Sequence, residues 1–480
     1  MAPGPRRPGP DAPARRVLVL TDSDSYVKWG AALAGRVPPS WHVRLVVAKG
    51  SAEPSPRQVQ EAVAGTVVDA RSVERVGLAD VRSILDQWRP DVLVTAARGL
   101  AVQTVIELAV ANRPDRPVLV SGLPGIALPV LPYGLGFRRS VDLFVLHSHR
   151  EIRAFTEASR SLAIPHRYAL ARLPFLAVPA AAQGPAPRPV PAAAQGPAPR
   201  PVPAAAQGPA PRPEPSQRNR IVFAAQALVP ESRQERMRMV EVLVRTARAN
   251  PDLEVVIKVR GLSDEPQTHA DQHPYPELLH EVDVPPNLTV ESGPMAAHLD
   301  RAVGLVTVSS TALLEAVASG VPVIALTDFG VEARQINLVF EGSGLLHDSA
   351  ELVAARFHHP AAAWRTDNYF HTPADDTWLA DLDDLLEARE REGLPPYPTA
   401  PDGLRKRVTM FFYRHQAFAG DAGPVSRVVE RAVVTVALRV SRSPWVVSRR
   451  FRPTRTAPMG DAGPADSGHA ELGPIEDRAG

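Results

Sequence analysis

Three consecutive hydroxyl residues stand between an apolar run and an amphipathic stretch in the second half of the chain. Ser309, Ser310 and Thr311 follow the apolar residues 304–308 and precede an apolar-periodic segment that ends at Gly320. Hydroxyl groups at the start of a helix accept hydrogen bonds from backbone N–H groups, and the same helix end carries a partial positive charge that suits a phosphate. We therefore predict a diphosphate-binding helix start here.

Glu315 lies one helical turn after these hydroxyls, where its carboxylate can reach the hydroxyl groups of a ribose. A second apolar run, 321–326, follows the helix, and two apolar runs joined by about a dozen helical residues predict parallel strands with a crossover. The alternative interpretation is a capped strand-helix-strand unit with a solvated glutamate.

Two aspartates follow the first apolar run of the chain, 17–20. Asp22 and Asp24 lie in a polar turn at the carboxyl end of a predicted strand, which is where open α/β sheets bind their ligands. Because side chains alternate there, we expect one of the two to point inward and to act as a general base on a hydroxyl. The alternative is that this turn caps the next helix.

Further polar residues occupy other predicted strand ends. His147 and His149 alternate after the run 142–146, so at most one of them can enter a shared cleft. One interpretation is a general base in that cleft, and the alternative is a histidine of a surface turn. Ser121 and Gly122 belong to a Gly- and Pro-rich loop, 121–125, that we expect near an acceptor. Asp328 follows the run 321–326 and is predicted to contact a sugar hydroxyl or to cap the next segment.

Apolar runs that alternate with helical segments place these residues in two α/β domains. The first domain has predicted strands at 17–20, 42–48, 91–95, 117–120 and 142–146, and the second at 221–226, 253–259, 288–290, 304–308 and 321–326. Such alternation is typical of doubly wound, Rossmann-type sheets. The first strand is not followed by Gly-x-Gly-x-x-Gly, which argues against a tightly bound NAD or FAD.

The hydroxyl-rich helix start, the glutamate four residues after Thr311 and the closing Gly320-Val321-Pro322 strand resemble the nucleotide-binding half of GT-B glycosyltransferases. The chain is similar to the capsule and teichoic-acid group, which includes CDP-glycerol and polysialic-acid transferases, and most resembles a family of actinobacterial glycosyltransferases. The resemblance implies that Ser309, Ser310 and Thr311 hold the donor diphosphate and that Glu315 holds the ribose.

The resemblance also implies a cationic contribution to donor binding. In the transferases a lysine precedes a short loop and a His-Pro pair, whereas here Lys258 and Arg260 are separated from His273 by a longer loop. This departure weakens the assignment of His273 as a phosphate ligand. Lys258 and Arg260 are expected to neutralise the donor, or else to be solvated charges at a strand end.

Composition limits the remaining possibilities. The chain has 480 residues and no cysteine, so disulfides and thiolate metal sites are excluded, and its formal charge of +2 gives no reason to expect a nucleic-acid partner. No apolar run approaches the roughly 20 residues that span a bilayer, so we expect a cytosolic protein. Neither a cofactor nor an obligatory metal is expected; a nucleotide-activated sugar is expected as co-substrate.

Two segments differ in composition from the predicted domains. The sequence VPAAAQGPAPRP occurs three times over 178–213, which predicts an extended linker. Residues 402–456 contain 12 Lys or Arg and three Asp or Glu, and the segment 425–451 mixes arginines with apolar residues. We expect this segment to lie on an anionic membrane surface or to dock on the protein itself.

The predicted organisation is therefore a disordered N-terminus (1–14), an acceptor domain (15–177), a linker (178–219), a donor domain (220–390), a basic helical tail (391–456) and a disordered end (457–480). The predicted function is transfer of a sugar or polyol phosphate to an acceptor in cell-surface glycan synthesis. A sugar-nucleotide 2-epimerase of the same fold and a non-catalytic scaffold are the alternatives.

Overall fold

The computed structural model describes residues 14–50, 52–111, 113–173, 176, 218–259, 272–395, 397 and 404–418. The predicted repeat linker, the basic segment 425–451, Arg260 and both predicted disordered ends, except Ala14, lie outside the described residues. None of the described helices combines the length and the apolar character needed to cross a membrane.

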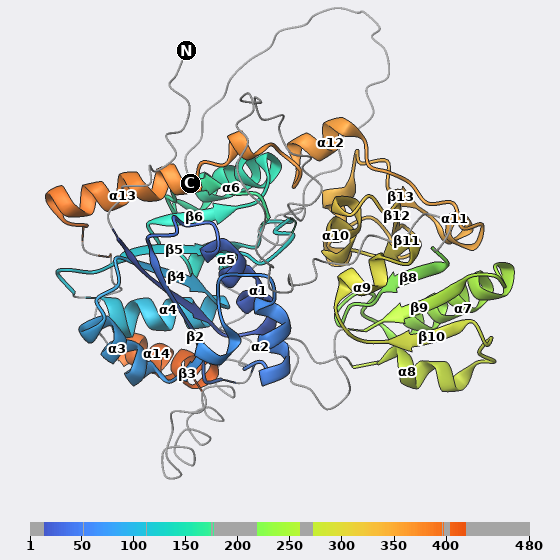
Figure 1. Cartoon of the computed structure of the whole chain (residues 1–480), viewed down its shortest axis with the longest axis horizontal. Coiled ribbons are helices and arrows are strands. Elements are labelled where there is room, and N and C mark those ends of the chain that lie inside the picture. The colour runs from blue at the N-terminus through green and yellow to red at the C-terminus, as the bar shows by residue number, and fades with distance from the viewer. Residues whose placement is uncertain are drawn as a thin grey trace, which may run out of the picture. The chain divides into compact units, whose positions relative to one another are not determined.

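The first domain contains strands β2 to β6 as labelled in Figure 1. Its parallel sheet has seven strands in the order β3-β2-β1-β4-β5-β6-β7. The strands are β1 (Arg16–Thr21), β2 (His42–Ala48), β3 (Glu74–Val76), β4 (Val92–Ala96), β5 (Val118–Gly122), β6 (Leu143–Leu146) and β7 (Tyr168–Leu170). The five strands expected from apolar runs are confirmed. β3 and β7 were not predicted, because three residues are too few to form a recognisable apolar run.

Strand β1 shows why this sheet needs helices on both faces. Val17 and Val19 belong to one buried cluster, whereas Leu18 and Leu20 belong to the other. Side chains of a strand alternate between the two faces of its sheet, so a continuously apolar strand must be covered twice.

Helices meet this requirement on each face. α1 (Asp24–Ala34), α2 (Pro56–Val63) and α13 (Trp378–Glu392) contribute to the first cluster. The second cluster receives residues of α3 (Leu78–Gln87), α4 (Gly99–Val105), the π-helical Ile106–Val110, α5 (Pro132–Gly136), α6 (His149–Leu162) and α14 (Leu404–Ala417). The result is a three-layer α/β/α domain.

Helix α13 completes the first domain although it follows the second domain in the sequence. Its residues Trp378, Leu382 and Leu386 are at most 3% exposed and lie in the core cluster of the first sheet. Residue Phe418, after α14, likewise lies in the core of the first domain. The donor domain was predicted to extend to residue 390, whereas the chain already packs against the first sheet from residue 378.

The second domain contains a parallel sheet of six strands in the order β10-β9-β8-β11-β12-β13. The strands are β8 (Arg220–Ala224), β9 (Glu254–Lys258), β10 (Leu288–Glu291), β11 (Ala302–Thr307), β12 (Val323–Leu326) and β13 (Leu346–His347). The five predicted strands are present, and the two-residue edge strand β13 was not predicted. The expectation of two parallel α/β sheets of Rossmann type is thus confirmed.

The long helix of this domain, α7 (Arg233–Ala249), begins with a reciprocal cap. The Ser232 hydroxyl accepts a hydrogen bond from Glu235 N, and the Glu235 carboxylate accepts one from Ser232 N, each at 3.2 Å. The remaining elements are α8 (Tyr275–Leu278), α9 (Met295–Leu299), α10 (Ala312–Ala318), α11 (Ser349–Val353), α12 (Ala362–Asp367) and the 3-10 turns Ala70–Ser72, Leu279–Glu281, Ala333–Gln335, Leu338–Phe340 and Pro373–Asp375.

Candidate functional site

The turn after β11 is held by a side-chain network centred on Gln226, which follows β8. The Gln226 Oε1 atom accepts a hydrogen bond of 2.9 Å from Ser309 N, and its Nε2 atom donates one of 3.2 Å to the Ser309 hydroxyl. The Thr307 hydroxyl donates to Ala224 O at 2.9 Å. Strands β8 and β11 are neighbours in the sheet, so this network fixes their carboxyl ends together.

The other two predicted hydroxyls adjoin the start of α10. The Ser310 hydroxyl accepts a hydrogen bond of 3.2 Å from Ala312 N, whereas Thr311 makes no side-chain cap. Thr311 instead packs closely against Gly125 of the first domain, where an added Cβ would lie 2.6 Å from the Thr311 methyl group. Ser309 and Ser310 are therefore engaged with the turn itself, although a hydroxyl that accepts a hydrogen bond can still donate one to a ligand.

Helix α10 is shorter than predicted. It ends at Ala318, and Gly320 then adopts a positive φ of 72°, a conformation that glycine accepts at little cost. Because α10 has only seven residues, its dipole is that of a short helix. The polarity of this turn therefore comes mainly from the hydroxyl groups and the Gln226 side chain.

Arg236 joins the loops that follow β8 and β9. Its guanidinium is 1% exposed and donates hydrogen bonds to the carbonyl oxygens of Pro230, Gln226 and Ala227 and, at 3.1 Å, of His273. The backbone of His273 is thereby brought to the same loop region as Gln226 and Ser309. Sequence reasoning did not single out Arg236, because its position on the amphipathic helix α7 predicts a solvated residue.

Lys258 is the last residue of β9, at the same edge of the sheet as the β8 and β11 turns. It is partly buried and lies opposite Glu291 of β10 in the parallel register. The predicted role of Lys258 in neutralising a donor phosphate is consistent with this position and stays a prediction. Arg260, two residues further on, lies outside the described residues.

The loop after β12 contains buried polar atoms without hydrogen-bond partners in the described part of the chain. Both polar atoms of the Gln335 side chain, which is 1% exposed, are unpaired in this sense, and so is Asp328 Oδ2. An unsatisfied buried amide costs about 1–3 kcal/mol and calls for an explanation. A polar ligand at the carboxyl end of β12 would supply one. Asp328 was predicted from the sequence, whereas Gln335, which lies nine residues beyond the end of β12, was not.

Glu315 forms an ion pair with the first domain. Its Oε1 atom lies 3.1 Å from the Lys28 Nζ atom of α1, and the side chains are 21% and 39% exposed. Such a partly exposed pair contributes little to stability, so Glu315 remains available to a ribose at small cost. The predicted ribose contact and this ion pair compete for one carboxylate.

Asp22 points inward, as expected for one of the two aspartates, but its carboxylate is already engaged. It is 2% exposed and accepts hydrogen bonds from Arg98 Nε at 2.7 Å and from Arg98 N at 3.1 Å. Burial raises the pKa of the Asp22 carboxyl, and the charges of Arg98 and Arg138 oppose this rise. Asp22 therefore holds the turn that starts α4, and this geometry does not favour its predicted role as the base.

Asp24 is the more accessible of the two aspartates. It is the first residue of α1 and is partly exposed, and its Oδ1 atom accepts a long hydrogen bond of 3.3 Å from the Ser25 hydroxyl. Among the aspartates predicted in this turn, Asp24 is the one whose carboxylate can meet an acceptor.

His147 is buried and both of its ring nitrogens are engaged. Trp29 Nε1 donates a hydrogen bond of 2.7 Å to His147 Nε2, which requires the proton to reside on Nδ1, and Nδ1 lies 2.8 Å from the acceptor Ala171 O. Burial lowers the pKa of His147 to about 4. The imidazole is thus neutral and structural, and we do not retain the predicted general-base role.

Ser121 and Gly122 lie within β5 and are not part of an exposed loop. The Ser121 hydroxyl donates to Thr95 O at 2.9 Å and accepts from Arg138 Nε at 3.1 Å. A Cβ on Gly122 would lie 2.5 Å from Trp29. These contacts position the end of the sheet, so neither residue offers a group to an acceptor.

Glu151 is a buried carboxylate that sequence reasoning missed. It is fully buried and accepts hydrogen bonds from Tyr369 Oη at 2.7 Å, from Ala127 N at 2.9 Å and from His147 N at 2.9 Å. Burial raises its pKa, which these hydrogen bonds oppose. A glutamate three residues after a serine at the start of an amphipathic helix is typical of an ordinary helix cap, so no local pattern singled it out.

Residues 17–385 match the family described as "Putative glycosyltransferase (DUF6716)". No curated protein matches. Solved structures that match include the co-structure of Staphylococcus aureus MnaA with UDP, at 9% identity and a TM-score of 0.46, covering 81% of this chain and 100% of that one. A Listeria monocytogenes protein described as "putative UDP-N-acetylglucosamine 2-epimerase" matches at 10% identity and a TM-score of 0.47, covering 81% of this chain and 100% of that one. The Streptomyces nogalater glycosyltransferase SnogD matches at 16% identity and a TM-score of 0.33, covering 80% of this chain and 97% of that one.

Proposed function

Because this chain belongs to the family described as "Putative glycosyltransferase (DUF6716)", which matches 17–385, we propose that it transfers a glycosyl or polyol-phosphate group from a nucleotide-activated donor to a hydroxyl acceptor. Family membership is the observation that carries this proposal. The arrangement of polar groups at the carboxyl ends of the second sheet supports it, since parallel sheets bind their ligands at this edge.

We place the donor on the second domain. The β11 turn presents the hydroxyls of Ser309, Ser310 and Thr311, and the neighbouring loop contains Gln335, a buried amide without a hydrogen-bond partner among the described residues. Glu315 accepts the ribose hydroxyls after leaving Lys28, and Asp328 meets a sugar hydroxyl. Lys258 and Arg260 provide positive charge for the diphosphate, and His273 lies in the same loop region.

The acceptor is proposed to approach the first domain, with Asp24 as the base. The acceptor oxygen forms a bond to the transferred group, and the acceptor proton passes to Asp24. In glycosyl transfer the bond from the sugar to the phosphate breaks, and the nucleotide leaves with all of its phosphates. In polyol-phosphate transfer the bond between the two phosphates breaks, and the nucleoside monophosphate leaves. The likeness to capsule and teichoic-acid transferases favours a cell-surface glycan or lipid-linked acceptor, reached by a protein whose segment 425–451 touches an anionic membrane from the cytoplasmic side.

Calorimetry with the full chain against UDP-, GDP-, CMP- and CDP-linked donors tests donor binding. We expect saturable binding of one donor class, a loss of affinity of about tenfold or more in Glu315→Gln, and unchanged or higher affinity in Lys28→Met, because the latter releases the carboxylate. Glu241→Gln, an exposed residue of α7, is the matched control.

Two results would contradict the proposal. A chain that binds none of the donors behaves as a scaffold. Equal losses in Glu315→Gln and Lys28→Met would show that the ion pair, and not a ribose contact, is what matters. Turnover of a UDP-sugar without any acceptor would instead favour an epimerase.

A further inference from the structure

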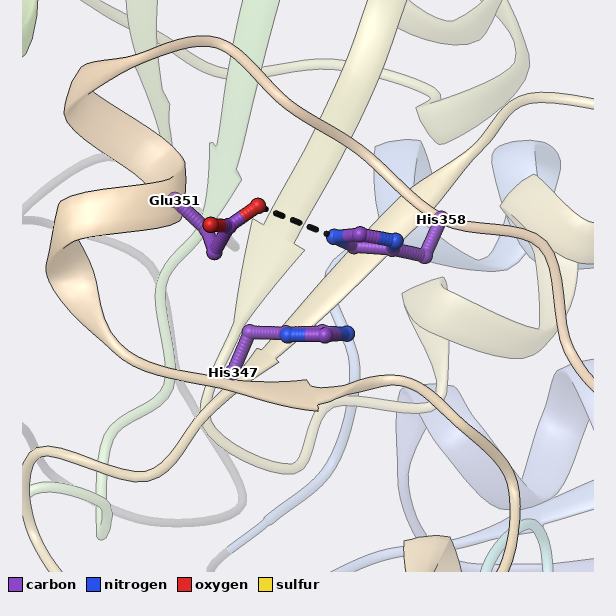
Figure 2. A group of neighbouring side chains, drawn as sticks. All are labelled: His347, Glu351 and His358. Carbon is purple, nitrogen blue, oxygen red and sulfur yellow. Dashed lines mark hydrogen bonds and ion pairs between the residues drawn. The ribbon is translucent and has the colours of Figure 1, made fainter.

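Two histidines and a glutamate form a cluster at the outer edge of the second sheet. His347 ends the edge strand β13, Glu351 lies in α11, and His358 follows that helix. One potential ligand atom of each residue lies within 4.8 Å of the others (Figure 2). None of the three has a part in the proposed transfer reaction. We propose that His347, Glu351 and His358 bind one divalent transition-metal ion, with Zn²⁺ as the best-suited member of this class.

The donor set matches the chemistry of this class of ions. Two imidazole nitrogens and one carboxylate oxygen are a common three-ligand set for zinc, with water completing a tetrahedral site. Imidazole also favours zinc, copper and nickel over magnesium and calcium, which take oxygen ligands.

The spacing of the ligand atoms requires small side-chain movements only. His358 Nε2 lies 3.3 Å from Glu351 Oε2. Two ligands about 2.1 Å from a metal ion in tetrahedral geometry are separated by about 3.4 Å. The metal would thus bridge two atoms already at the correct separation, while His347 moves inward from a distance of at most 4.8 Å.

The two imidazole rings lie face to face in the described conformation. Their centroids are 3.7 Å apart and their planes differ by 16°, and Figure 2 shows the Glu351 carboxylate directed toward His358 beside this stacked pair. Lone pairs of parallel rings do not converge on a point, so metal binding requires one ring to tilt out of the stack. The side chains are 32% exposed for His358 and 25% for Glu351, which leaves room for this tilt and a path for the ion.

Backbone contacts hold the three residues in place. His358 N donates to Val323 O at 3.1 Å and Val323 N donates to His358 O at 2.8 Å, while Thr327 N donates to His347 O at 3.0 Å. The Asp348 carboxylate caps the helix that carries Glu351 by accepting from Ala350 N at 3.0 Å. Ligands on fixed backbone lose little entropy when they bind an ion.

The ring orientation of His347 also favours ligation. Its Nε2 atom lies 3.1 Å from the carbonyl oxygen of Gly344, so the Nε2–H group donates and the lone pair resides on Nδ1. Metal-binding histidines generally donate their other N–H group to a carbonyl or carboxylate in this way. In His358 the proton on Nε2 must move to Nδ1 through solvent before Nε2 can bind the ion.

Arg356 competes with the ion for Glu351. Its Nε atom lies 3.0 Å from Glu351 Oε2 and its Nη2 atom 2.6 Å from Oε1, and this arginine lowers the pKa of the Glu351 carboxyl to about 2. Because the Arg356 side chain is 61% exposed, it can move into solvent when the ion binds.

Zinc titration of the untagged full-length chain, after removal of metals with a chelator, tests the proposal. We expect one equivalent of Zn²⁺ to bind, with at least a tenfold weaker affinity in His347→Ala, His358→Ala and Glu351→Gln. His359→Ala, an exposed neighbour, is the matched control and should bind as the native chain does.

Arg356→Met provides a second readout that does not depend on weakening the site. It removes the competing cation, so zinc affinity should rise severalfold, and the rise should shrink when Glu351 is also changed to Gln. Circular dichroism of each variant confirms that it is folded. Unchanged affinity in Glu351→Gln, or one equivalent still bound by the His347→Ala, His358→Ala double variant, would overturn the proposal, as would the absence of saturable binding by the folded native chain.

Discussion

The carboxyl ends of the two parallel sheets carry different kinds of polar groups. At the first sheet the buried carboxylates are matched to protein donors, as in the pair of Asp22 with Arg98 and the three hydrogen bonds to Glu151, and the Ser23 hydroxyl is the neutral group that is buried without a partner among the described residues there. At the second sheet most of the groups are neutral, and Gln335 is buried without a partner among the described residues. Equivalent positions in two similar sheets have thus been used for different purposes.

The difference teaches that a charged residue at a strand end is a weak sign of catalysis. A buried charge must be compensated, and once protein groups compensate it, the charge becomes part of the framework. A buried neutral group that lacks a partner is a better sign of a ligand, because the free energy it loses on folding can be regained on binding. Four predictions test this contrast, from the largest expected effect to the smallest.

Glu151→Ala should reduce the free energy of unfolding by about 3–5 kcal/mol, because it leaves the Tyr369 hydroxyl and two backbone N–H groups buried without an acceptor. Urea denaturation measures this loss. Glu157→Ala, on the exposed side of the same helix, is the control and should change stability by less than about 0.5 kcal/mol. Equal effects of the two changes would remove the contrast between buried and exposed charge.

His147 should make the protein sensitive to acid. Its pKa is lowered to about 4 in the folded chain, below the value of about 6.5 in an unfolded chain, so the unfolded state binds more protons between these values. The contribution of neutral His147 to the free energy of unfolding is fully present above pH 6.5. It is lost as the pH falls toward 4, by up to about 3 kcal/mol.

Urea denaturation at pH 7 and pH 5 measures this dependence. His147→Gln should show a smaller loss of stability on acidification than the native chain, whereas His42→Gln, at an exposed position, should not. An unchanged acid dependence in His147→Gln would show that other groups cause it.

Gln335→Leu should separate stability from binding in the second domain. Replacing an unpaired buried amide by an apolar side chain of similar size should raise the free energy of unfolding by about 1 kcal/mol. Donor affinity, measured by calorimetry, should fall. A marked loss of stability would mean that the amide has partners that stabilise the fold, and the second domain would then resemble the first.

Lys28→Met should have the smallest effect on stability, below about 1 kcal/mol, because its ion pair with Glu315 is partly exposed. Thermal unfolding at low and high salt measures it. Greater destabilisation would place the Lys28–Glu315 pair with the structural charges of the first domain.

Most of the sheet strands could be predicted because a strand buried on both faces is a continuous apolar run, as residues 17–20 and 304–308 are. The partners of polar residues could not. Asp22 and Asp24 look alike in sequence, and only the position of Arg98, 76 residues away from Asp22, distinguishes them. The hydroxyls of the β11 turn were identified, but the residue that holds them, Gln226, lies 83 residues before Ser309. Contacts between distant segments leave no local pattern.

The return of the chain to the first domain through α13 has a consequence for biosynthesis. Trp378, Leu382 and Leu386 cover a face of a sheet whose strands emerge from the ribosome more than 200 residues earlier. The second domain is contiguous until that return and can fold as soon as it is made, whereas the first must wait with the part of one apolar face that α13 covers still exposed. The domain that is translated first is therefore the last to be finished.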